Sequence, residues 1–184
     1  MSVPEQQKQD LLAAIPKLRA FAVSLCGRHD QADDLVQETL VKAWANMASF
    51  QPGTNMVAWL FTILRNALYT EYRKHRREVQ DSEGVHAAKL VTAPSQDGHI
   101  HFQEFRNVLL SLPVDQREAL ILVGASGMSY IEAAEICGCP VGTMKSRVNR
   151  ARVRLAELLA PGESVRETLE LAEPALADLS HAGT

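Results

Sequence analysis

With 184 residues, the chain is long enough for one large domain or two small ones, and its 46% hydrophobic and 22% charged residues are typical of a soluble globular protein. Aromatic residues make up only 5%, so the core must consist mainly of Leu, Ile, Val and Ala, which favours helices packed on helices. The chain shows neither the pattern of a signal peptide nor an apolar run near the ~20 residues of a membrane span, so we expect a cytoplasmic protein without membrane contact.

The net charge of −3 is unevenly distributed. Residues 161–184 carry five acids and one arginine, or −4, so residues 1–160 carry +1. Basic residues gather at 73–77 and again at 145–154, and two compact basic stretches favour nucleic-acid binding. The three cysteines lack paired CxxC spacing, and no second ligand pair accompanies Cys137 and Cys139, so we expect no disulfide, metal or other cofactor.

Three helices are predicted in the N-terminal part of the chain, which we take as a domain over residues 10–78. Pro16 is expected at the first position of a helix that Gly27 ends. Asp30 is expected to cap a second helix with apolar residues at 4-3-4 spacing. After a Pro-Gly loop, Thr54 or Asn55 is expected to cap a long third helix that ends in a basic segment.

Residues 79–100 lack a sustained apolar period and contain Gly84, Pro94 and Gly98, which is typical of a flexible linker. A second helical domain is predicted over residues 101–160, and residues 161–184 form an acidic tail. In the second domain we predict helices over 102–110, 114–123, a short one opened by the capping box of Ser129 and Glu132, and one over 141–159.

The short capped helix, a turn around Gly138 and the basic final helix form a helix-turn-helix pattern. No acid occurs between Val141 and Leu155, whereas a merely solvated helix face usually mixes charges, so DNA contact is favoured. Arg and Lys can neutralise phosphates, and Arg and Asn can pair with base edges. The candidate contacts are Lys145, Ser146, Arg147, Asn149 and Arg150.

The segment CPVGTMKSRVNRARVRL, residues 139–155, resembles the recognition helix of the sigma-4 domain in extracytoplasmic-function sigma factors of bacterial RNA polymerase. This resemblance covers roughly residues 10–160. It implies an all-α fold of two small domains, a sigma-2 helical bundle and a sigma-4 helix-turn-helix, joined by a flexible linker. The five candidates of the final helix would then contact the −35 element of a promoter.

DDLVQETLVKAW, residues 33–44, resembles the helix by which this family binds core polymerase. Helical periodicity places four residues opposite its buried stripe, namely Asp34, Gln37, Glu38 and Val41. The resemblance implies that they bind the clamp helices of the β′ subunit, and that the chain also contacts the β flap.

WLFTILRNALYTEYRKHRR, residues 59–77, resembles the helix that opens the −10 element, and the preceding loop is where relatives hold a flipped base. The candidates to contact −10 DNA are Phe50, Thr54, Asn55, Met56, Arg65, Asn66, Arg73, Lys74, Arg76 and Arg77. Val57 stands where a basic residue is expected. Trp44 and Trp59 are expected in the core.

The expected function is promoter-specific initiation of transcription through binding alone, because no nucleophile–base pair, phosphate loop or metal cluster indicates an enzyme. The segments FQPGTNM and AWLFTILRN most resemble those of the general-stress-response subgroup of these sigma factors in alphaproteobacteria, which implies control by an anti-sigma factor. Two alternatives are a sigma mimic that only sequesters an anti-sigma factor and an autonomous repressor. The basic residues of 145–154 argue against the mimic, and a repressor should bind duplex DNA unaided.

Overall fold

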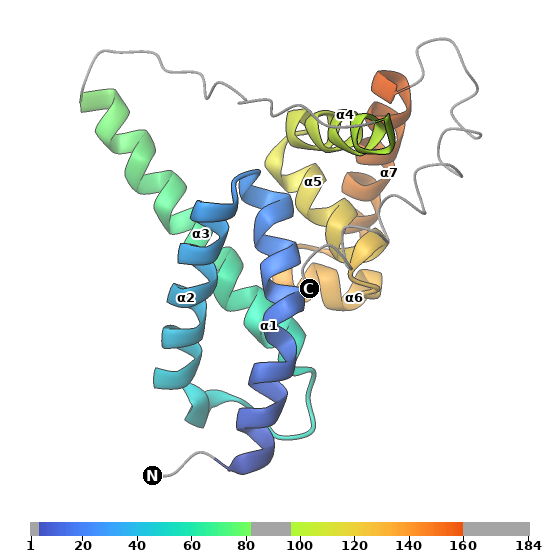
Figure 1. Cartoon of the computed structure of the whole chain (residues 1–184). Helices are drawn as coiled ribbons and strands as arrows, with labels where there is room; N and C mark the ends of the chain where they lie inside the picture. Colours follow the sequence, from blue (N-terminus) through green and yellow to red (C-terminus); the bar gives the residue numbers. More distant parts are fainter. Residues whose placement is uncertain (1–3, 82–96, 160–184) are drawn as a thin grey trace.

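The computed structural model describes residues 4–81 and 97–159, and every regular element in these ranges is helical. The first unit contains α1 (Glu5–Cys26), α2 (His29–Ala45), the short 3-10 helix η1 (Met47–Ser49) and α3 (Met56–Asp81). The second unit contains α4 (Asp97–Ser111), α5 (Val114–Leu120), η2 (Ile121–Ala125), α6 (Tyr130–Cys137) and α7 (Val141–Leu159) (Figure 1). The all-α prediction with two small helical units is confirmed.

In the first unit, α1 and α3 pack their apolar stripes against each other and against α2. The rings of Phe21 and Phe61 stack with their centroids 4.3 Å apart, and Leu18, Leu60 and Leu64 are fully buried around them. Burying side chains of this size removes apolar surface from water, which contributes about 1.5–3 kcal/mol for each. These contacts fix the direction of the outer faces of α2 and α3.

Two predicted helix starts in the first unit are wrong. Pro16 lies inside α1, which begins eleven positions earlier at Glu5 because buried Leu11 and Ala14 extend its apolar stripe. The helix tolerates the one backbone donor that Pro16 lacks. Asp30 lies in the first turn of α2 instead of capping it, and its carboxylate pairs with Arg28.

Two other predicted helix starts, those of α3 and α6, are confirmed. Asn55 caps α3, because its Oδ1 accepts the amides of Val57 and Ala58 at 3.1 and 3.2 Å. Ser129 Oγ accepts the amide of Glu132 at 3.2 Å, and Glu132 Oε2 accepts the amide of Ser129 at 2.9 Å, which completes the capping box.

In the second unit, α7 packs on α5 and α6 and buries the predicted face of Met144, Val148, Ala151 and Leu155. Leu158, the next residue in that rhythm, is 42% exposed. The helix predicted over 114–123 is α-helical only as far as Leu120, and Ile121–Ala125 then form the π-helix η2. Gly138, with φ of +61°, makes the turn between α6 and α7 in a conformation that suits glycine.

The predicted linker, 79–100, is helical at both ends, because α3 continues to Asp81 and α4 begins at Asp97. Residues 82–96 and the predicted acidic tail, 161–184, lie outside the described residues. Of the helices described, none is long and apolar enough to cross a membrane.

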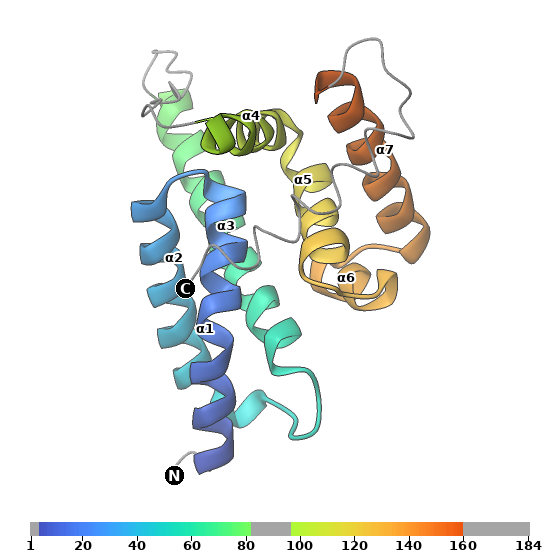
Figure 2. The same cartoon turned by 45° about the vertical axis from the view of Figure 1, so that its right-hand side comes forward.

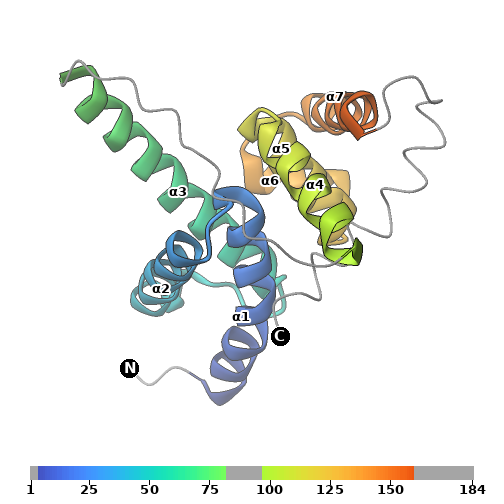
Figure 3. The same ribbon diagram turned by 45° about the horizontal axis from the view of Figure 1, so that its top comes forward.

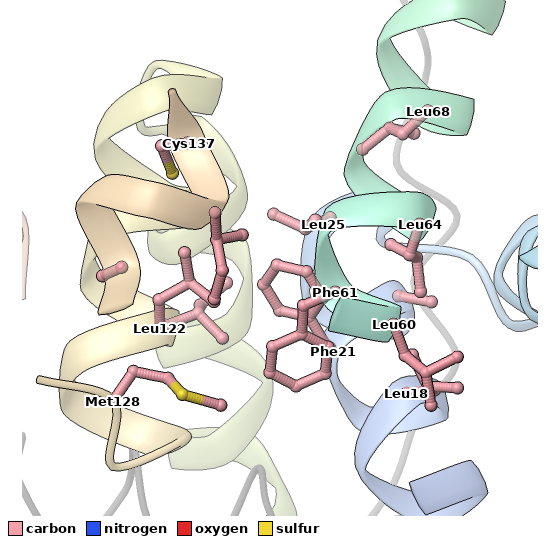
Figure 4. Packing of buried hydrophobic residues seen from close by; sticks show 14 of the residues in the cluster. Leu18, Phe21, Leu25, Leu60, Phe61, Leu64, Leu68, Leu122, Met128 and Cys137 are labelled. Carbon is pink, nitrogen blue, oxygen red and sulfur yellow. The ribbon is translucent and has the colours of Figure 1, made fainter. Parts of the chain in front are cut away.

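The two units pack directly on each other, with α3 against α6 and α1 against α4 and α5 (Figures 2 and 3). Figure 4 shows Leu122 and Met128 of the second unit facing Phe21, Leu25 and Phe61 of the first. Residues of both units therefore form one continuous buried cluster. In all three ribbon views, α2 lies on the side of the first unit away from α4–α7.

Candidate nucleic-acid and protein interfaces

The outer face of α2 presents the four residues predicted to bind a protein partner. All of them are exposed, and Val41 is 69% exposed. Glu38 forms an ion pair of 2.6 Å with Lys42 on the same helix, while Arg19 of α1 holds Asp33 at 2.9 Å. The face therefore combines carboxylates with an apolar side chain, which suits a partner helix that is basic and partly apolar.

Trp44 belongs to this face, although the sequence prediction placed it in the core. Its side chain is 51% exposed and lies one helical turn after Val41. Val41 and Trp44 are both exposed on one side of α2, and neighbouring exposed apolar side chains can form a patch that binds another protein. The signal that could have found it is spacing, because position 44 follows 37 and 41 along one side of a helix.

The recognition helix α7 presents Lys145, Ser146, Asn149 and Arg150 to solvent. Arg150 folds back on its own helix, where its Nη2 donates to Ser146 Oγ at 2.9 Å. Lys145 Nζ lies 6.0 Å from the centroid of the Tyr130 ring on α6.

Arg147, the fifth candidate on α7, is positioned differently. Its side chain is only 22% exposed, and its Nε lies 3.2 Å from Asp115 Oδ2 of α5. This ion pair connects the recognition helix to its support, so Arg147 is less available to a ligand than its neighbours.

Asn66 on α3 opens onto a hollow of about 440 Å³ between α3 and the end of α2. Trp59 lies in its wall and packs on Phe50 at 5.3 Å between ring centroids. The other residues around the hollow, which the sequence analysis did not identify as candidates, are Lys42, Asn46, Ser49, Ile63 and Thr70. A mixed polar and apolar hollow beside an exposed amide can accommodate a planar polar group.

The remaining candidates for −10 contact differ in exposure. Arg73, Lys74 and Arg77 are exposed further along α3, and the side chain of Arg76 lies outside the described residues. Thr54 is exposed, and its hydroxyl donates to the Gln51 carbonyl at 2.7 Å.

Phe50 and Met56 depart from the prediction that they contact DNA. Each is 7% exposed and belongs to the core beneath the loop that both were expected to present. The apolar side chains of this loop are needed to seal the ends of α2 and α3, which leaves only its polar residues at the surface.

Arg65 and Asn55 face the second unit. The Nε of Arg65 lies 2.8 Å from Oε1 of Glu118, whose side chain is fully buried, and Tyr69 donates its hydroxyl to Glu118 Oε2 at 3.3 Å. Asn55 Nδ2 donates to Glu132 Oε1 at 3.2 Å. Both residues are therefore −10 candidates whose side chains contact the second unit.

The environment of Glu118 changes the ionisation of its neighbours. Burial raises the pKa of Glu118 itself, and the Arg65 guanidinium opposes that change. Burial, followed by the Glu118 charge, raises the pKa of Tyr69 to about 12 and that of Cys137 to about 12. Within the described ranges, no group of His, Cys, Asp and Glu residues is arranged to hold a metal ion.

Comparison with known proteins gives two family matches. The model for Sigma-70 region 2 matches residues 12–78, and the model for Sigma-70 region 4 matches residues 102–155. The chain is 62% identical over 159 residues to the ECF RNA polymerase sigma factor EcfG from Rhodopseudomonas palustris (strain TIE-1), which covers 86% of this chain and 88% of that protein.

Two of the solved structures that are similar to this chain are complexes of two proteins. One is the sigma factor RpoE in complex with the anti-sigma factor NepR from Bartonella quintana, with a TM-score of 0.78, 56% identity and coverage of 87% of this chain and 100% of that one. The other is CnrH in complex with the cytosolic domain of CnrY, with a TM-score of 0.54, 27% identity and coverage of 82% and 83%.

Proposed function

We propose that the two units of this chain recognise different elements of a promoter. The chain belongs to the extracytoplasmic-function sigma factors of bacterial RNA polymerase. A sigma factor binds core polymerase and directs it to promoters. The chain does this through binding energy alone, with partners that are core polymerase, promoter DNA and an anti-sigma factor.

The observation that carries the proposal is the division of α7 into two faces. One face is fully buried against α5 and α6, so the helix is rigidly mounted, and the opposite face presents Lys145, Asn149 and Arg150. Such a helix fits the major groove, where Arg pairs with guanine and Asn with adenine. We assign the −35 element to this face, with Arg147 in a supporting role through Asp115.

The −10 element is assigned to α3. Asn66 and the hollow beside it would receive a base that leaves the stack, and Thr54 supports the edge of this site. Arg73, Lys74 and Arg77 would follow the phosphates of one strand. Extruding a base costs a few kcal/mol, so the protein must supply contacts that only the open strand can use.

The outer face of α2 is assigned to core polymerase, with Asp34, Gln37, Glu38, Val41 and now Trp44 against the clamp helices of β′. Control by an anti-sigma factor follows from the similarity to the RpoE structure, which was solved with NepR bound. The regulon is proposed to be the general stress response, on the basis of the similarity to EcfG.

Run-off transcription tests this function. Core polymerase with the purified chain should give a specific transcript from a promoter that carries both elements, and destroying the −35 sequence should abolish the transcript. Arg28→Ala, which removes an exposed arginine outside the proposed surfaces, should transcribe normally. A chain that binds core polymerase but yields no specific transcript would refute the proposal.

A further inference from the structure

Arg147 of α7 is paired with an acid of its own unit. Its side chain is 22% exposed, and its Nε lies 3.2 Å from Oδ2 of Asp115 on α5, whose side chain is 45% exposed. Arg150 lies three positions later on α7 and Arg154 four positions after that, so the three arginines share one edge of the helix. Arg150 and Arg154 are exposed. Asp115 therefore lies at the end of a row of cations.

This edge borders the face that the proposed function places on the −35 element. Arg147 follows the buried Met144 by three positions and precedes the exposed Arg150 by three, so it lies where the buried and exposed faces of α7 meet. When a helix enters the major groove, a side chain at its flank is closer to the phosphates than to the base edges. A cation there would add affinity for every sequence, because phosphate contacts carry no sequence information.

The pair of Arg147 and Asp115 has no net charge. In the structure, the guanidinium is directed to the carboxylate. If Arg147 turned to a phosphate, Asp115 would be left as an unpaired acid beside the anionic DNA backbone, and its repulsion would offset the gain. An ion pair that is this exposed adds little to folding stability, so stability alone does not account for it.

We propose that Asp115 limits the sequence-independent affinity of the second unit for DNA, because it neutralises Arg147 at the border of the recognition face. This inference rests on the proposed function and adds a residue that sets the strength of the −35 contact. Sequence-independent affinity arises when cations of a protein neutralise phosphates and release counterions. With the pair intact, the contacts of Lys145, Asn149 and Arg150 with bases supply a larger share of the affinity.

The test measures binding of holoenzyme to two fluorescent promoter duplexes by anisotropy at several salt concentrations. The duplexes differ only in the −35 element, which is intact in one and scrambled in the other. Asp115→Asn should bind both duplexes roughly fivefold more tightly than wild type at about 0.15 M salt, and its slope of log affinity against log salt should be steeper by about 0.9. Arg147→Ala should weaken binding to both duplexes and make the slope shallower by a similar amount.

Asp30→Asn is the matched control. Asp30 resembles Asp115 in lying in the first turn of a helix and pairing with an arginine, but it and Arg28 lie outside the proposed surfaces. This variant should bind both duplexes like the wild type. Combining Asp115→Asn with Arg147→Ala makes the position of the pair neutral again, so the double variant should restore the wild-type slope.

Two alternative roles of the pair give different results. If Arg147 contacts a phosphate and Asp115 does not oppose it, Asp115→Asn will match Asp30→Asn, and the double variant will bind as weakly as Arg147→Ala. If the pair only supports the helix, both single variants will weaken binding without changing the slope. Either result would overturn the inference.

The wild type separates this inference from the proposed function. A wild-type holoenzyme that does not distinguish the two duplexes refutes the assignment of the −35 element, and the inference fails with it. A wild type that prefers the intact duplex, together with either alternative result, refutes only the role of Asp115.

Discussion

Arg150 is held by a residue of its own helix before any ligand arrives. Its guanidinium donates to the hydroxyl and, at 3.3 Å, to the carbonyl of Ser146, so part of the entropy of ordering a long side chain is already lost in the free protein. An arginine held in this way can present its donors to a guanine edge in a fixed direction.

Arg150→Ala should weaken −35 binding by holoenzyme by about 1–3 kcal/mol and relax selectivity at one base pair. Competition between promoters with single substitutions in the −35 element measures both effects. Arg28→Ala controls for the loss of an exposed positive charge. An equal loss on all sequences would instead indicate a phosphate contact.

Asn66→Ala should leave assembly of the holoenzyme unchanged but slow promoter opening by roughly tenfold, because one good polar contact to an extruded base is worth about 1–3 kcal/mol. Permanganate footprinting over time measures the opening. Equal melting by wild type and variant would remove Asn66 from this role.

Three groups, the buried Cys137 and the partly buried Cys26 and Tyr69, predict a loss of stability in alkali. Burial raises the pKa of Cys26 from 9.0 to about 11, that of Cys137 from 9.0 to about 12 and that of Tyr69 from 10.0 to about 12. The unfolded chain therefore releases these protons first, and the free energy of unfolding falls as pH rises above 9. The two cysteines should account for a fall on the order of 2 kcal/mol between pH 9 and pH 10, and Tyr69, which is partly exposed, should add little because solvent screens its charge.

Urea unfolding at the two pH values measures this change. Cys137→Ala removes one of the three groups, so its loss should be about 1 kcal/mol smaller than that of the wild type. Identical pH dependence in both proteins would show that Cys137 is not protected from ionisation in the folded chain.

At the scale of elements, each helix that serves a surface is supported by the face it buries. In α2, Leu35, Val36 and Ala43 are buried, so the outward residues keep fixed positions. Trp44 extends the exposed side of this helix beyond Val41 and adds a large apolar contact. Aromatic residues at such positions often dominate the binding energy of an interface.

Trp44→Ala should weaken binding to core polymerase by about 1–2 kcal/mol with little effect on stability, because half of the side chain is exposed already. Titration of labelled chain with core polymerase measures the affinity. Ile131→Ala is the control, since Ile131 is another large apolar residue, 61% exposed, but on α6. Unchanged affinity in Trp44→Ala would place the polymerase contact elsewhere on α2.

At the scale of the whole molecule, one of the places where the two units approach each other closely lies between α1 and α4. Gly27 ends α1 with φ of +74°, and a Cβ at this position would lie 2.8 Å from Leu110 Cδ1 of α4. The backbone conformation therefore requires glycine here, and a Cβ would in addition displace the end of the Leu110 side chain of the second unit.

Gly27→Ala should loosen the packing of the two units and increase the radius of gyration in small-angle scattering. Gly138→Ala is the matched control, because it carries a similar positive φ but meets no atom within 4 Å. Both should lose about 1–2 kcal/mol of stability through backbone strain. The same scattering curve for both variants would show that the Leu110 contact does not hold the units together.

The sequence by itself determined that the chain is helical, most of the buried helix faces and the family, because apolar periodicity, caps and motifs are local properties of the chain. The capping box at Ser129, the cap at Asn55 and the bounds of α7 followed from such signals. Only the tertiary structure decided which polar residues remain available. Arg65 meets Glu118 across 53 positions of sequence, Asn55 meets Glu132 across 77 positions, and Phe50 and Met56 turn inward. These outcomes depend on how two units pack, and no local pattern encodes that contact.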